Sequence, residues 1–184
     1  MDPYPLIASL AAEYPEAGRI LTIHGELVAA KALSVADRLR DYEIDREFLF
    51  QAAVLHDIGM IGTDLPELGC YGEEPYIRHG IIGRRMLEEA GYPRHALVCE
   101  RHFLTGVSRE IIERQGMDLP LRDMLPITLE ERLICFADCF YSKKLDRLRR
   151  EKSVEKAMQG LPEFARPQFR EWLAEFREPK VPSV

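Results

Sequence analysis

Apolar side chains recur every three or four positions along most of the chain, as in helices that bury one face. The clearest case is residues 17–40, where Ile20, Ile23 and Leu27 are separated mainly by charged and polar side chains. The same spacing predicts further helices over residues 3–14, 45–59, 79–91, 94–103 and 129–148, and one or two between 153 and 177. Because no alternating strand of useful length is found, the pattern predicts an all-α fold.

Local signals place several helix ends. Thr128 and Glu131 form a T-x-x-E capping box in front of the helix predicted over 129–148. Gly59 stands where a glycine typically ends a helix, here the one that begins near Asp45. The segment 60–78 contains five glycines and prolines, so we expect a long loop there, and loops of this length in compact domains are usually functional.

The composition fits one globular domain. The chain has 184 residues, 46% hydrophobic and 30% charged, so we expect a single domain over 1–184, with a metal-binding core near 18–144 and a helical extension near 150–178. The net charge of −6 argues against binding of nucleic-acid polymers or anionic membranes. The beginning of the chain has no cationic, apolar leader, and the four cysteines form no C-x-x-C pair, which predicts a cytoplasmic protein with reduced thiols.

Six polar residues interrupt the apolar pattern on different predicted helices. They are four imidazoles and two carboxylates: His24, His56, Asp57, His79, His102 and Asp138. Each alone would be an ordinary buried polar residue, but together they form a set of metal ligands from facing helices. Imidazole and carboxylate suit Fe, Mn, Co, Ni or Zn, and a carboxylate can bridge two ions. Adjacent residues on a regular helix do not share a face, so His56 and Asp57 can both face one cavity only where the helix ends.

The order of these six residues resembles the H…HD…H…H…D pattern of the HD-domain superfamily, and "HDIG" at 56–59 is similar to the motif of its HDIG subgroup. The resemblance covers residues 18–144. It implies a bundle of five core helices, here with additional N- and C-terminal helices, around a metal centre. It also implies hydrolysis of phosphate esters, often of nucleotides. Arg101-His102 stands where the cyclic-dinucleotide phosphodiesterases of the superfamily carry His-His, and no GYP motif follows, so that activity is not expected.

Carried over residue by residue, the resemblance makes His24, His56, Asp57 and Asp138 the ligands of a first metal. Asp57 would bridge to a second metal held by His79 and His102, so two divalent ions are favoured over one. In such a site, two ions about 3.5–4 Å apart activate a hydroxide and stabilise the charged oxygens of an in-line displacement. Asp57 is therefore the expected catalytic residue.

We expect a small phosphorylated substrate, possibly a nucleotide, and no assignment of oligomeric state follows from the pattern. Phosphate needs cationic partners, and three basic residues near the proposed ligands are candidates: Arg78, Arg101 and Lys143. Two other classes remain open. A di-iron oxygenase of the myo-inositol oxygenase type uses a similar six-ligand set, and a non-catalytic module would use the metal only to hold the bundle together.

Overall fold

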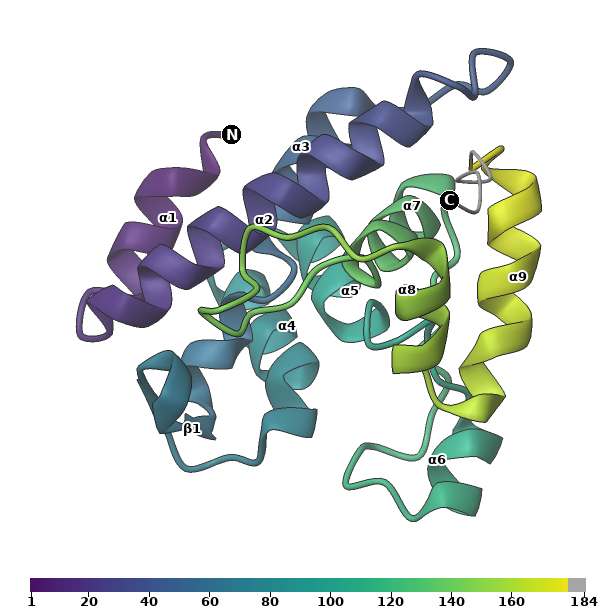
Figure 1. The fold of residues 1–184 in the computed structure, drawn as a ribbon. Coiled ribbons are helices and arrows are strands. Elements are labelled where there is room, and N and C mark those ends of the chain that lie inside the picture. Colours follow the sequence, from purple (N-terminus) through teal and green to yellow (C-terminus); the bar gives the residue numbers. More distant parts are fainter. Residues whose placement is uncertain (179–184) are drawn as a thin grey trace.

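Residues 1–178 are described by a computed structural model, and this part of the chain is helical apart from one very short hairpin (Figure 1). Its α-helices are α1 (Pro3–Leu10), α2 (Pro15–Ala36), α3 (Arg46–Leu55), α4 (His79–Glu89), α5 (Pro93–Arg101), α6 (Arg109–Gln115), α7 (Leu129–Asp138), α8 (Val154–Gly160) and α9 (Arg166–Glu175). The predicted all-α fold is confirmed.

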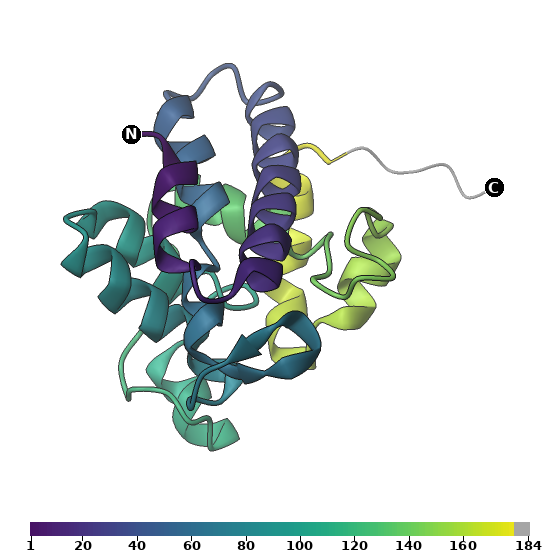
Figure 2. The same ribbon diagram turned by 90° about the vertical axis from the view of Figure 1, so that its left-hand side faces the viewer.

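Helix α2 is the longest element and organises the bundle. It packs against α3 and against α7, while α1 lies beside its first half (Figures 1 and 2). A Cβ atom on Gly25 would lie 2.6 Å from the carbonyl oxygen of Val54, so the two helix backbones meet where only glycine fits. This contact fixes His24, on α2, close to His56, which follows α3.

The segment 58–78 is ordered by short turns rather than by long elements. It contains the 3-10 helices η1 (Ile58–Gly62), η2 (Pro66–Leu68) and η3 (Tyr76–Arg78), and the antiparallel pair β1 (Asp64–Leu65) and β2 (Cys70–Tyr71). The expected loop is therefore compact. It connects the end of α3 to the start of α4, and η1 packs against α4.

The helix predicted over 129–148 is shorter than expected. The capping box of Thr128 and Glu131 is present at its start, but α7 ends at Asp138 and residues 139–152 form a loop. Lys152 explains the early end, because its Nζ donates to the carbonyl oxygens of Cys139 (3.0 Å) and Tyr141 (2.7 Å), and its backbone N–H donates to Phe140 (2.8 Å). A lysine from outside the helix thus satisfies carbonyls that a longer helix would have bonded internally.

The C-terminal extension contains two helices, α8 and α9, separated by a short connection that includes the 3-10 helix η4 (Glu163–Ala165). Trp172 and Phe176 are almost fully buried, and Phe176 lies edge-on to Phe136 of α7, with ring centroids 5.2 Å apart. The extension therefore contributes to the same hydrophobic core as α1 to α5 and α7.

All four cysteines are free thiols. Among the described residues, no helix combines the length and the apolar character needed to cross a membrane.

Candidate metal centre

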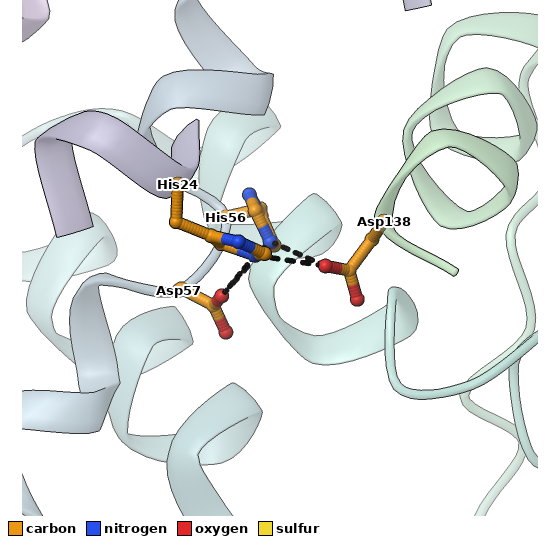
Figure 3. A group of neighbouring side chains, drawn as sticks. All are labelled: His24, His56, Asp57 and Asp138. Atoms are coloured by element: carbon orange, nitrogen blue, oxygen red, sulfur yellow. Dashed lines mark hydrogen bonds and ion pairs between the residues drawn. The ribbon is translucent and has the colours of Figure 1, made fainter. Parts of the chain in front are cut away.

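The six polar residues selected from the sequence lie together in the middle of the bundle. They come from α2, from the turn after α3, from the start of α4, from the end of α5 and from the end of α7, and all have less than one-fifth of their side chain exposed. Four of them, His24, His56, Asp57 and Asp138, are shown in Figure 3, where Asp138 points from α7 toward the two imidazoles.

The first group contains these four residues. Nε2 of His24 lies 2.8 Å from Oδ1 of Asp138 and 3.2 Å from Oδ2 of Asp57. Nε2 of His56 lies 3.0 Å from the same Asp57 oxygen and 3.6 Å from the same Asp138 oxygen. The four donor atoms fall within 4.8 Å of one another, close enough to bind one metal ion.

The second group uses the other oxygen of the same aspartate. Oδ1 of Asp57 lies 3.3 Å from Nε2 of His79 and 3.3 Å from Nε2 of His102, and these two nitrogens are 3.0 Å apart. Asp57 therefore presents one carboxylate oxygen to each group. This is the arrangement of a carboxylate that bridges two adjacent metal positions.

Hydrogen bonds to the backbone determine which imidazole nitrogen is free to bind a metal. Nδ1 donates to the carbonyl oxygen three residues earlier in His56 (2.6 Å), His79 (2.7 Å) and His102 (2.8 Å). A carbonyl only accepts, so Nδ1 carries the proton and Nε2 of the neutral ring is a bare lone pair. All three rings thus direct the ligand nitrogen into the centre, with the outer hydrogen bond that metal-binding histidines typically have.

The protein alone does not supply hydrogen-bond partners for several buried polar atoms of the cluster, and these atoms are suitable ligands for a metal ion. Nε2 of His56 and both carboxylate oxygens of Asp57 are buried and form no regular hydrogen bond, and the ammonium group of Lys143, 2.7 Å from Oδ2, balances only one of the two Asp57 oxygens. The lone pairs of His79 and His102 face each other at 3.0 Å. Buried groups left in this way cost several kcal/mol each, and divalent cations would satisfy all of them at once.

Burial and charge separate the protonation states of the two groups. Burial, reinforced by His102, lowers the pKa of His79 to about 3, so this ring is neutral. Burial also acts against a charge on His56, but Asp57 and Asp138 outweigh it and raise the pKa of His56 to about 10. For Asp57, burial is opposed by His56 and Lys143, which hold the pKa of its carboxyl well below the usual range. Metal binding at the first group would displace the His56 proton, since a ligand nitrogen is deprotonated.

The turn after α3 explains how two consecutive residues reach one site. The α-helix ends at Leu55, Asp57 has φ −104° and ψ 6°, and a 3-10 helix begins at Ile58. This change of direction lets both side chains face the cluster. It also brings Gly59 against the start of α4, where a Cβ atom would overlap the backbone of His79 and Gly83.

A cavity of about 170 Å³ opens beside the second group. His79, His102 and Asp138 line it together with Tyr76, Lys143 and Leu161 of the C-terminal extension. Lys143 reaches the centre itself, with Nζ 2.7 Å from Oδ2 of Asp57. Burial disfavours its ammonium form, but Asp57 outweighs burial and raises the pKa of Lys143 well above its ordinary value.

The two arginines selected from the sequence lie elsewhere. Arg101 donates to both carboxylate oxygens of Glu131 (2.9 and 3.2 Å), and Arg78 pairs with Glu74 (3.1 Å) and Asp118 (3.4 Å). Neither lines the cavity. Of the three basic candidates, only Lys143 is brought to the metal centre.

Lys152 also lines the cavity and was missed in the sequence. It lies fourteen residues after Asp138, and the expected helix over 129–148 would have carried it far from the ligands. No signal at the sequence level indicates that the chain turns back at this point.

Comparison with known proteins identifies the family of this chain. The model of the HD domain family matches residues 22–142, more than half of the chain. An uncharacterized protein of Methanocaldococcus jannaschii is 37% identical over 110 residues, which are 59% of this chain and 57% of that protein. A tRNA (cytidine(56)-2′-O)-methyltransferase of Picrophilus torridus is 32% identical over 126 residues, 68% of this chain and 32% of that protein.

The chain thus spans less than two thirds of the length of these curated relatives. No solved structure matches it significantly. The extent of the family match, together with clustered histidines and aspartates able to bind divalent metal, shows that this chain belongs to the HD-domain superfamily.

Proposed function

We propose that this protein hydrolyses a phosphate ester of a small molecule, using two divalent metal ions held by His24, His56, Asp57, His79, His102 and Asp138. The observation that carries the proposal is the position of Asp57, whose two oxygens face two separate donor groups. A site for one structural ion would need only one of these groups and would be closed by four protein ligands. Here His79 and His102 of one group and Asp138 of the other line a cavity.

When bound, the metal ions would supply an acidified water as nucleophile and would neutralise charge on the phosphate oxygens. The chain's own contribution is orientation and charge. The Nδ1 bonds of His56, His79 and His102 hold the rings in one tautomer. Lys143 adds an ammonium group at the cavity wall, 2.7 Å from Asp57, where it can donate to a phosphate oxygen.

The size of the cavity favours a phosphoryl group at the metal centre. Pockets that enclose a whole drug-sized ligand usually measure about 300–1,000 Å³, whereas this one measures about 170 Å³. Phe103, Leu104 and Leu161 provide apolar parts of its wall, which restrict access of bulk water to the reacting group.

The name of the Picrophilus relative gives no support for methyl transfer by this chain, because the match covers only 32% of that protein. An oxygenase that uses two irons is the competing activity, since the same donor set suits iron. Dependence of turnover on dioxygen distinguishes this activity from hydrolysis.

The test is reconstitution of metal-free protein with Mn, Fe, Co, Ni or Zn, followed by measurement of phosphate release from a panel of phosphate monoesters and diesters. We expect turnover under anaerobic conditions with at least one metal and none with Asp57→Ala. Turnover that requires iron and dioxygen, without phosphate release, would establish the oxygenase instead. Stable binding of metal with no turnover of any kind would support a non-catalytic module.

A further inference from the structure

A second, larger hollow adjoins the metal cavity. It measures about 810 Å³ and lies between the loop of residues 142–152 and helix α8, which stand next to each other in both views (Figures 1 and 2). Lys152 and Gly160 line both the cavity and this hollow. A ligand whose phosphate lies at the metal centre can therefore extend past Lys152 into the second space, which we call the basic groove.

Four basic side chains line the basic groove: Arg147, Arg150, Lys152 and Lys156. The groove also contains two acidic residues, and both are already paired. Asp146 contacts Arg147 at 2.9 Å, and Glu151 contacts Lys31, on α2, at 2.9 Å.

The positive charge of the groove is therefore only partly neutralised. Within residues 1–178, no carboxylate lies within ion-pair distance of Arg150 or Lys156, and Lys152 is bonded to two neutral carbonyls.

The charge is local. Residues 142–160 contain seven lysines and arginines and three acidic residues, a net charge of 7 − 3 = +4, in a chain with a net charge of −6. The side chains that line the groove contribute four basic and two acidic groups of this segment, a net charge of 4 − 2 = +2, and a positively charged hollow beside a site for phosphate favours a second anionic group on the same ligand.

We propose that the basic groove binds a second phosphate group of the substrate, so that the substrate is a small organic compound with two separated phosphates. This inference rests on the proposed function for the position of the first phosphate. A volume of about 810 Å³ falls in the range of about 300–1,000 Å³ for small-molecule pockets. A specific nucleic-acid interface would instead cover roughly 1,000–2,500 Å² of positively charged protein surface, and the chain outside residues 142–160 has a net charge of −6 − 4 = −10.

Phosphonates test the proposal without turnover, because their C–P bond is not broken by hydrolysis of an ester. Calorimetry on the metal-loaded protein compares propylphosphonate with a series of alkylene bisphosphonates of increasing chain length. We expect at least one bisphosphonate to bind roughly tenfold tighter or more, the equivalent of one charge-assisted hydrogen bond. The variant R150E/K156E should abolish this advantage and leave propylphosphonate binding unchanged. The matched control is K144E/R149E, which changes two exposed basic residues of the same segment that do not line the groove.

Equal binding of mono- and bisphosphonates would overturn the proposal, as would equal losses in the two double variants. Tight binding of single-stranded RNA that both double variants weaken would show a nucleic-acid surface instead. Failure of the proposed function is separate: hydrolysis of monoesters without bisphosphonate preference refutes only the groove, and bisphosphonate preference without hydrolysis of any ester refutes only the reaction.

Discussion

A Cβ atom on Gly59 would overlap the carbonyl oxygen of His79, so the turn that carries Asp57 and the helix that carries His79 are in direct backbone contact. Gly59 is thus the residue at which the turn and α4 meet, and this contact brings the two ligand groups together. A neighbouring helix passes closely enough to place His79 3.3 Å from Asp57 only because no side chain intervenes.

Gly59→Ala should therefore separate the two groups. The new methyl group must displace α4, and overpacking of this kind costs about 1–3 kcal/mol or more. We expect a lower free energy of unfolding in urea and loss of the metal held by His79 and His102. Gly160→Ala is the control, since a Cβ atom there meets nothing within 4 Å. Equal stability of the two variants would contradict the close contact.

Asp57→Asn should remove both metal ions rather than one, because each oxygen of Asp57 faces a different group. Asp138→Asn is the informative partner, since Asp138 belongs to the first group alone. Elemental mass spectrometry of the purified, metal-reconstituted variants measures the number of ions per chain. Retention of both ions by Asp57→Asn would mean that Asp57 is not the bridge.

The histidines should divide into two classes. His79→Ala should release mainly one ion and His24→Ala mainly the other, because the two residues belong to different donor groups. Competition with a chelator of known affinity measures each loss. Identical and negligible effects of the two substitutions would leave the two-group arrangement without support.

Lys143→Met should reduce turnover while leaving the metal content unchanged. Removal of one preorganised group that stabilises charge in a transition state typically costs about 10²–10³ in kcat. Lys144→Met is the control, since Lys144 is exposed and does not line the cavity. Metal loss in Lys143→Met, or an equal decrease in both variants, would assign Lys143 a structural role.

Metal binding to the first group should release a proton near neutral pH. With its pKa raised to about 10, His56 is protonated in the metal-free protein at pH 7, and a ligand nitrogen must be deprotonated. The affinity of the protein for the first ion should therefore fall as the pH falls, because protons compete with the metal for the same nitrogen. Calorimetric titration in buffers with different ionisation enthalpies counts the protons. Binding enthalpies that do not depend on the buffer would contradict this assignment.

Much of the fold and of the candidate site could be predicted from local features of the sequence. The helical period and the caps depend on residues a few positions apart, so the helices around Ile20 and after Thr128 could be predicted. The clustering of His24, His56, Asp57, His79, His102 and Asp138 could also be predicted, because histidine and aspartate on otherwise apolar helix faces need a partner. The order of the six residues was sufficient to indicate the family before any contact was known.

Only the tertiary structure decided which basic side chains reach the metal centre. Lys143 contacts Asp57 because α7 ends at Asp138, and α7 ends there because Lys152, fourteen residues further along, bonds the carbonyls of Cys139 and Tyr141. Arg101, next to a ligand in sequence, is held instead by Glu131. Periodicity determines which face of a helix is buried, whereas the path of a loop depends on distant partners that become neighbours only when the chain is folded.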